Sequence, residues 1–285
     1  MTVVGTAGVV VDEGRIDANT ARCEAAISAA ASAGVQLLVL PECALTGYYF
    51  RSADEVHAAA IDPDGDALTR LRRHARQADM TIVVGFLERV VDEVHNSAAV
   101  LTPDGATTVT RKTHLPHLGA DRFAVPGDRI GPVIDTPAGR VGVAICYDFR
   151  FPETCRALAL DGADIVAVPV NWSTRVKVLA DHFVPTRAVE NGIFVVVADR
   201  IGAVDGVEHL GASRIVAPDG RVLAARAESS AGADVTAQID VGLARDKATV
   251  FAPASFEIDL FADRRPALYG ALVHQRSTEE EDQDA

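Results

Sequence analysis

VGVAICYDFRFPE, residues 141–153, contains a strand pattern, a sharp turn and a helix start in direct succession. The apolar run that begins at Val141 ends on Cys146, and a mixed aromatic and charged segment follows it. Pro152 and Glu153 are typical of a first helical turn, because proline is accepted there and an acidic side chain favours that end of a helix. The stretch therefore predicts an α/β unit with a thiol at the carboxyl end of its strand.

The same alternation continues on both sides of this stretch. Strand-like runs and helical patterns follow one another along the chain, with runs at 2–11, 35–40, 164–170 and 193–199 and helical patterns at 17–34 and 176–191. Gly34 is placed to end the first helix. The buried face of that helix is expected to consist of small apolar side chains, namely Ala18, Ala21, Ala25, Ile27 and Ala29.

Two Pro-Asp-Gly turns indicate that the sheets are mixed rather than all parallel. The turn at 103–105 separates NSAAVLT from TTVTRK, and the turn at 218–220 separates ASRIVA from RVLAAR. Each pair of runs predicts a β-hairpin, whose two strands are antiparallel. We therefore expect helices packed on sheets that contain both hairpins and helical crossovers.

The chain has 285 residues, of which 48% are hydrophobic and 24% are charged, so it can bury a large core. No linker-like segment rich in Ser, Gly and Pro interrupts the pattern, and a single domain over residues 1–276 is expected. The final segment, STEEEDQDA (277–285), is nearly all polar. It is expected to be a disordered acidic tail without a catalytic role.

Charge and cysteine content exclude several classes of protein. The formal net charge of −13 argues against a nucleic-acid partner. No apolar run reaches the roughly 18 residues of a membrane span, and the amino terminus lacks the pattern of a leader, so we expect a cytoplasmic protein without a membrane partner. The cysteines match neither zinc spacings nor a disulfide framework and are expected to be reduced; they are Cys23, Cys43, Cys146 and Cys155.

Three strand-like runs end on chemically reactive side chains. VQLLVLPE ends on Glu42, TTVTRK on Lys112 and VGVAIC on Cys146. Ligands in α/β proteins bind beyond the carboxyl ends of strands, so these three groups are candidates for one site. Taken singly, they also fit a loop acid, a solvated lysine and a small core thiol. The helix expected at Pro152 favours a functional Cys146, because its positive end is expected to stabilise a thiolate.

Three motifs resemble, in order and separation, the motif blocks of the carbon-nitrogen hydrolase, or nitrilase, superfamily. They are LPECALTGY (40–48), RKTHLP (111–116) and CYDFRFPE (146–153). The resemblance implies an α/β fold of the four-layer αββα type with two mixed β-sheets. It also implies assembly into homodimers or larger homo-oligomers.

The resemblance further implies a catalytic triad of Glu42, Lys112 and Cys146, with no metal and no organic cofactor. Hydrolysis of an unactivated amide needs a nucleophile, a proton carrier and a positive group beside the developing oxyanion. Glu42 is expected to move the protons and Cys146 to attack the carbonyl, while Lys112 and the backbone N–H of Tyr147 hold the oxyanion. The expected reaction converts a small linear carboxamide to a carboxylic acid and ammonia through a thioester.

The chain departs from the family pattern at positions that bear on the substrate. Many relatives carry a second glutamate where this chain has Ala120, and the adjacent Asp121 is a candidate for that role, with an ordinary loop aspartate as the alternative. The tripeptide YDF (147–149) favours an amide over a nitrile. N-carbamoyl-D-amino-acid hydrolases have two arginines here, of which only Arg150 is present, so an N-carbamoyl substrate remains an alternative. Arg150 also fits an ion pair with Glu153.

Side chains near the motifs are candidates for the pocket wall. Tyr48, Tyr147 and Trp172 combine apolar area with a polar atom, although Tyr48 and Trp172 also fit packing at a sheet edge. His114 and His117 form an H-x-x-H pattern, but no third ligand is evident, and zinc is not expected.

Three alternatives to this amidase scheme remain open. A Cys–His dyad with His114 or His182 would activate Cys146 without Glu42. A catalytically silent binding or assembly module would have the same fold, although the joint presence of all three reactive residues argues against it. Acyl transfer to a nucleophile other than water would proceed through the same thioester.

Overall fold

The computed structural model describes residues 1–226 and 234–274. It divides into two compact units, Met1–Asp246 and Lys247–Ala285, and the cavity described below lies within the first. The single domain expected over residues 1–276 stays a prediction. The acidic tail expected at 277–285 lies outside the described residues.

The first sheet has the strand order β14-β1-β2-β3-β4-β5. Its strands are β1 (Thr2–Ala7), β2 (Leu37–Val39), β3 (Thr81–Val90), β4 (Glu93–Leu101), β5 (Thr107–Arg111) and β14 (Asp234–Ile239). β1, β2 and β3 are parallel, whereas the β1–β14, β3–β4 and β4–β5 pairs are antiparallel.

The second sheet has the strand order β13-β12-β9-β8-β7-β6. Its strands are β6 (Ile134–Thr136), β7 (Gly139–Val143), β8 (Ile165–Val170), β9 (Phe194–Asp199), β12 (Arg214–Val216) and β13 (Val222–Ala225). The central strands β7, β8 and β9 are parallel, and the outer pairs are antiparallel. Both hairpins predicted from the Pro-Asp-Gly turns, β4–β5 and β12–β13, are confirmed.

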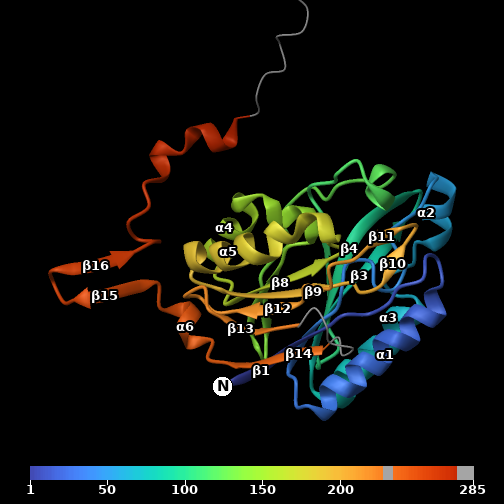
Figure 1. Ribbon diagram of the computed structural model, residues 1–285, viewed down its shortest axis with the longest axis horizontal. Helices are drawn as coiled ribbons and strands as arrows, with labels where there is room; N and C mark the ends of the chain where they lie inside the picture. Colours follow the sequence, from blue (N-terminus) through green and yellow to red (C-terminus); the bar gives the residue numbers. More distant parts are fainter. Residues whose placement is uncertain (227–233, 275–285) are drawn as a thin grey trace, which may run out of the picture. The chain divides into compact units, whose positions relative to one another are not determined.

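Helices cover the outer face of each sheet, and the two sheets pack against each other (Figure 1). The covering helices are α1 (Ile16–Ser32) and α3 (Asp66–Ala78) on the first sheet and α4 (Pro152–Leu160) and α5 (Val184–Asn191) on the second. Val39 and Val83 from the first sheet share an apolar cluster with Val143 and Val196 from the second. The four-layer αββα sandwich implied by the resemblance is thus confirmed.

Shorter elements connect these layers. They are α2 (Ala53–Ala59), α6 (Gly242–Arg245), the strands β10 (Ala203–Val204) and β11 (Val207–Glu208), the 3-10 turns Gly119–Arg122, Cys146–Arg150 and Thr174–Val176, and the π-helix Leu179–Phe183. The described residues of the second unit form an antiparallel hairpin of β15 (Ala248–Ala252) and β16 (Phe256–Asp259), followed by the 3-10 turns Pro266–Leu268 and Gly270–Val273.

The buried face of α1 differs from the expected one. Of the five residues expected there, only Ile27 is buried, and the buried set is Asn19, Thr20, Cys23, Ile27 and Ala30. Asn19 accepts a hydrogen bond from the N–H of Asp12 and donates one to the carbonyl of Leu45. Because these bonds satisfy its amide, a polar residue occupies the buried face, and the four alanines expected there are exposed.

The strand, turn and helix predicted at 141–153 are confirmed, with β7 ending at Val143 and α4 beginning at Pro152. The helical stretch expected at 176–191 is only partly α-helical, because a π-helix precedes α5. Pro185 lies at the start of α5 and has no N–H to continue a regular hydrogen-bond ladder backward.

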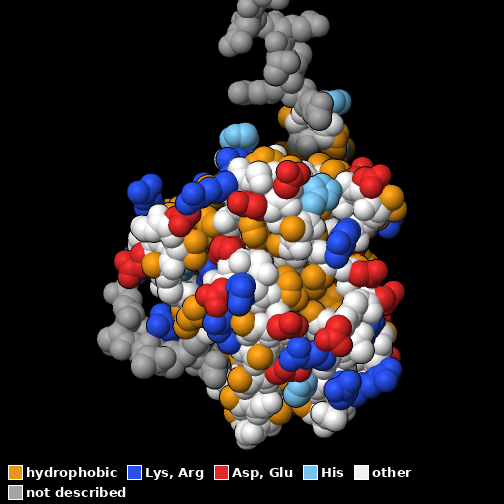
Figure 2. Space-filling model, turned by 90° about the vertical axis from the view of Figure 1, so that its right-hand side faces the viewer, with side chains coloured by type: hydrophobic (Ala, Val, Ile, Leu, Met, Phe, Trp, Pro, Cys, Tyr) orange, Lys and Arg blue, Asp and Glu red, His pale blue; other side chains and the backbone are white. Residues whose placement is uncertain are grey.

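The face of the molecule in Figure 2 carries basic and acidic side chains that are interspersed, with apolar side chains near its centre. Among residues 1–226 and 234–274, no helix combines the length and the apolar character needed to cross a membrane.

Candidate active site

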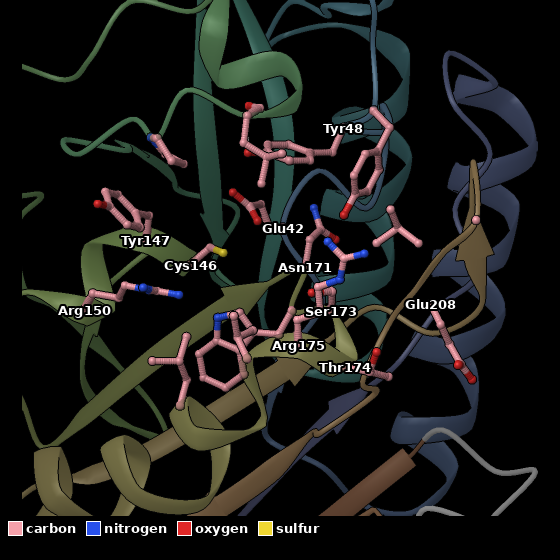
Figure 3. Close-up of a pocket in the computed structure, with 18 residues that line it drawn as sticks. Glu42, Tyr48, Cys146, Tyr147, Arg150, Asn171, Ser173, Thr174, Arg175 and Glu208 are labelled. Carbon is pink, nitrogen blue, oxygen red and sulfur yellow. Dashed lines mark hydrogen bonds between the residues drawn. The ribbon is translucent and has the colours of Figure 1, made fainter.

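The three candidate catalytic residues follow strand ends and come together at one cavity. Glu42 follows β2, Lys112 follows β5 directly, and Cys146 follows β7. Glu42 and Cys146 line a cavity of about 520 Å³, and Figure 3 shows the sulfur of Cys146 directed toward Glu42. Lys112 is fully buried behind the cavity wall, where its Nζ lies 2.7 Å from Oε1 of Glu42. The structure thus brings Glu42, Lys112 and Cys146 close together.

Gly85 on β3 allows the segment that carries Glu42 to approach the sheet. A Cβ atom at Gly85 would lie 2.5 Å from the backbone nitrogen of Cys43 and 2.6 Å from Cα of Glu42, which is too close for any side chain. Cys43 itself has a positive φ of 49°, so the chain turns sharply directly after Glu42. Close backbone packing therefore determines where the Glu42 carboxylate lies.

A buried polar cluster connects Glu42 to Asp121. Lys112 Nζ donates hydrogen bonds to Oε1 of Glu42 at 2.7 Å and to Oδ2 of Asp121 at 2.6 Å. Asn96 on β4 donates through Nδ2 to both carboxylates, at 2.8 Å each. The hydroxyl of Tyr48 lies 2.9 Å from Oδ2 of Asp121. Asp121 is therefore a buried partner of Lys112, beside the position where many relatives carry glutamate.

Two atoms of this cluster have unused hydrogen-bonding capacity. Oε2 of Glu42 is buried and has no hydrogen-bond partner among the described residues. Lys112 uses two of its three ammonium hydrogens on the carboxylates. Oε1 of Glu42 is thus held by Lys112 and Asn96, whereas Oε2 remains able to accept a proton.

The electrostatics of the cluster favour a charged lysine. Burial alone would lower the pKa of Lys112, but the carboxylates of Glu42 and Asp121 outweigh it and raise that pKa well above its usual value. Burial raises the pKa of Asp121, and the nearby Glu42 acts in the same direction, while Lys112 opposes both. The cluster is therefore stable only while the lysine stays between the two acids.

Cys146 lies at a strained turn, and its surroundings raise the pKa of its thiol. Its φ is +46°, a left-handed backbone conformation that residues other than glycine rarely adopt. Burial raises the pKa of Cys146 well above the ordinary thiol value, and the charge of Glu42 raises it further. The N–H of Asn171 hydrogen-bonds the sulfur and opposes this shift. Burial and the charge of Glu42 thus act against the effect expected from the helix end, which stays a prediction.

Asp148 ties the loop of Cys146 to the loop of Lys112. Its Oδ1 accepts hydrogen bonds from the hydroxyl of Thr113 at 2.8 Å and from the backbone N–H of His114 at 2.8 Å. Nδ1 of His114 lies 2.7 Å from the same oxygen. Because Thr113 directly follows Lys112, this carboxylate links the loop after β5 to the loop after β7.

Neither histidine proposed for a Cys–His dyad lines the cavity with Cys146. His114 pairs with Asp148 through Nδ1 and stacks on Phe151 at a centroid distance of 3.9 Å. His182 is exposed, in the π-helix before α5. Neither histidine is therefore placed beside the thiol, whereas Glu42 lines the same cavity.

The three aromatic residues expected at the pocket wall all line the cavity. Tyr48 and Trp172 are each 3% exposed, so they also contribute to packing. Arg150 lines the cavity as well, with its guanidinium 5.7 Å from the ring centre of Tyr147. Within the described part of the chain, Arg150 forms no ion pair with Glu153, and that alternative is wrong.

Sequence reasoning missed three polar residues of this region. Asn96 is a buried amide within the apolar run of β4, and such an amide in a strand signals a specific hydrogen-bonding role. Asn171 and Arg175 line the cavity after β8, where the expected strand 164–170 ends. No motif points to Arg175, because its place depends on the path of the loop.

Among residues 1–226 and 234–274, no group of three or more His, Cys, Asp or Glu side chains is arranged to hold a metal ion. His114 is bonded to Asp148, and His117 is exposed on the loop before the turn Gly119–Arg122. The H-x-x-H pattern therefore does not form a metal centre in the described structure.

Comparison with known proteins supports the family resemblance found in the motifs. The family model for carbon-nitrogen hydrolases matches residues 7–248. A protein named nitrilase from Pyrococcus abyssi is 39% identical over 254 residues, which cover 89% of this chain and 93% of that protein. An (R)-stereoselective amidase from Pseudomonas sp. is 37% identical over 242 residues, or 82% of this chain and 81% of that protein.

A similar fold occurs in the amidase from Nesterenkonia sp. AN1. The structure of one mutant of that amidase has a TM-score of 0.78 and 24% identity, and covers 95% of this chain and 97% of that one. It shows covalent addition of the acetamide moiety of fluoroacetamide at the active-site cysteine of that protein. The family match, together with the 39% identity to a full-length relative, confirms the resemblance found in the motifs: the chain belongs to the carbon-nitrogen hydrolase family.

Proposed function

We propose that this protein is a thiol amidase that converts a small linear carboxamide to a carboxylic acid and ammonia. The observation that carries the proposal is the meeting of Cys146 and Glu42 at one cavity, with Lys112 held behind Glu42 at 2.7 Å. The family membership and the amidase among the relatives support the same reaction class. The catalytic roles below are assigned on chemical grounds.

In the first half-reaction, Glu42 accepts the thiol proton of Cys146 through its unpartnered oxygen, and the sulfur attacks the amide carbon. The carbonyl oxygen becomes an oxyanion, which the backbone N–H of Tyr147 and the charge of Lys112 stabilise. Glu42 then gives the proton to the amide nitrogen. The carbon–nitrogen bond breaks, ammonia leaves, and a thioester remains on Cys146.

In the second half-reaction, Glu42 takes a proton from a water molecule, whose oxygen attacks the thioester carbon. The carbon–sulfur bond breaks, the proton passes from Glu42 to the sulfur, and the carboxylic acid is released. One water is consumed for each amide, and the enzyme returns to its starting protonation state.

The buried cluster of Glu42, Lys112 and Asp121 lowers the electrostatic cost of moving the thiol proton to Glu42. Before the reaction, Glu42, Lys112 and Asp121 together carry one net negative charge, since two carboxylates surround one ammonium. When Glu42 takes the thiol proton, the cluster becomes neutral and the negative charge appears on the reacting atoms. The site therefore moves an existing charge over a short distance instead of creating a new one in a dry environment.

An N-carbamoyl compound is the second candidate substrate. Arg150 lines the cavity and forms no ion pair within the described residues, which leaves its guanidinium able to bind a carboxylate. The reaction would use the same thiol and the same acid. It would release carbon dioxide as well as ammonia, so product analysis separates the two substrates.

Replacing Glu42 by glutamine is expected to lower kcat for amide hydrolysis by roughly 10²–10⁴-fold, because glutamine cannot accept the thiol proton. The fold should persist, since Lys112 keeps its bond to Asp121 and glutamine keeps an oxygen acceptor. Ammonia release from acetamide, butyramide and succinamate (the monoamide of succinic acid) measures the effect. A matched control is His182→Gln, which should keep wild-type turnover because His182 is exposed.

A Cys–His dyad predicts the opposite pattern. In that case the glutamine variant at residue 42 would keep most of its activity, and a histidine variant would lose it. If the wild-type protein releases no ammonia from any of these amides, the proposed function is wrong.

A further inference from the structure

The cavity next to Cys146 continues past the reacting groups into a polar region. Its wall there contains Asn171 and the segment Ser173–Thr174–Arg175 on one side and Arg150 on the other (Figure 3). A volume of about 520 Å³ is within the range of sites for small organic molecules. The reacting carboxamide itself occupies only the end at Cys146, so the remaining space is available to the rest of the acyl group.

Asn171 carries an amide that lacks partners in the protein. The residue is 8% exposed, and neither Oδ1 nor Nδ2 of its side chain has a hydrogen-bond partner among the described residues. A buried amide left unpaired destabilises the folded protein, because its polar atoms lose the hydrogen bonds that water would supply. Its own backbone N–H bonds the sulfur of Cys146, so this amide is held next to the nucleophile. It is therefore suited to bind a polar group of the substrate.

Four charged side chains line the cavity, two of them positive and two negative. Arg150 and Arg175 line the cavity, and Arg175 forms no ion pair, side-chain hydrogen bond or ring contact within residues 1–226 and 234–274. The negative side chains at the cavity are Glu42, which is paired with Lys112, and Glu208. Figure 3 shows the carboxylate of Glu208 turned away from Cys146. In a chain with a net charge of −13, two arginines at one cavity without acidic partners are a specific local feature.

We propose that this site selects amides whose acyl group ends in a carboxylate, which Arg175 and Asn171 bind while the carboxamide lies at Cys146. Guanidinium and carboxylate form paired, charge-assisted hydrogen bonds, and the unpartnered amide supplies a further donor. Arg150 adds positive charge but is already engaged with the ring of Tyr147, so its contribution is the smaller one. The inference rests on the proposed amidase function and names its substrate class as monoamides of short dicarboxylic acids.

The test compares three amides of similar length that differ in terminal charge: succinamate, butyramide and 4-aminobutyramide. Wild-type kcat/KM is expected to be about tenfold or more higher for succinamate than for butyramide, and lowest for the cationic amide. Arg175→Met is expected to remove this preference, and Arg150→Met to reduce it. Arg129→Met is the matched control, because Arg129 is exposed outside the cavity and its removal changes the net charge equally.

A second measurement does not depend on turnover. Calorimetric titration of the wild-type protein with succinate and with butyrate should show about tenfold tighter binding of succinate, and Arg175→Met should abolish the difference while Arg129→Met keeps it. Equal kcat/KM for succinamate and butyramide would overturn the inference and leave the amidase proposal standing. Absence of all hydrolysis would refute the amidase proposal, and equal binding of succinate and butyrate would then overturn this inference separately.

Discussion

Replacement of Cys146 by alanine is expected to lower kcat for amide hydrolysis by about 10⁴-fold or more, because no other group at the cavity can form the thioester. Serine should not rescue activity well, since an alcohol is a much weaker nucleophile than a thiol at the same position. Ammonia release under saturating amide measures both variants.

The fold of these variants should be preserved. Alanine and serine experience the same backbone strain as cysteine at a φ of +46°, so neither releases it nor adds to it. Substrate binding is therefore expected to persist in Cys146→Ala. The matched control is Cys23→Ala, which removes another buried thiol from α1 and should keep wild-type kcat. Substantial hydrolysis by Cys146→Ala would refute the thioester route.

Replacement of Lys112 by methionine is expected to reduce both activity and stability. Loss of an oxyanion-stabilising charge should lower kcat by about 10²–10³-fold. Lys112 is completely buried between Glu42 and Asp121, so its removal leaves two buried carboxylates without a cation. Breaking a buried pair in this way typically lowers the free energy of unfolding by about 3–5 kcal/mol. Chemical denaturation at several pH values measures the loss.

The pH dependence of that loss has a definite sign. In the variant, burial and the neighbouring carboxylate raise the folded-state pKa of Asp121, and no lysine opposes them. A carboxyl whose pKa is raised by folding stabilises the protein at low pH and loses that contribution as pH rises through the folded pKa. The stability deficit relative to wild type should therefore be smaller near pH 5 than near pH 8.

A double variant separates stability from catalysis. Lys112→Met with Asp121→Asn removes one of the two buried charges and should recover much of the lost stability, since only Glu42 remains to be neutralised. It should recover no activity, because the cation is still absent. A single Lys112→Met variant as stable as wild type at neutral pH would contradict the buried arrangement.

Much of the fold follows from local sequence patterns. The run VGVAIC followed by proline predicts β7 and the start of α4, and two Pro-Asp-Gly turns predict hairpins that the structure contains. The buried face of α1 could not be predicted, because hydrogen bonds to Asp12 and Leu45 allow Asn19 to be buried there. These partners are distant in sequence or outside the helix, so no helical periodicity reveals them.

The residues of the candidate site could be proposed from the motifs, but their environment could not. Motif order indicated Glu42, Lys112 and Cys146, and the structure brings them together. The raised pKa of Cys146 comes from burial and from the charge of Glu42, and Lys112 is buried with Asn96 and Asp121 as part of one hydrogen-bonded cluster. These quantities arise from the packing of two sheets, which a linear pattern does not contain.

The central claim is that Cys146 carries the acyl group during amide hydrolysis. The most direct test is to quench the wild-type protein with acid during turnover of succinamate and to measure its intact mass. Peptide mapping then locates any added group. The account predicts an added mass equal to the succinyl group on Cys146 alone, lost on treatment with hydroxylamine as the hydroxamate forms. Rapid ammonia release with unmodified protein throughout, or an acyl group on any other residue, would contradict it.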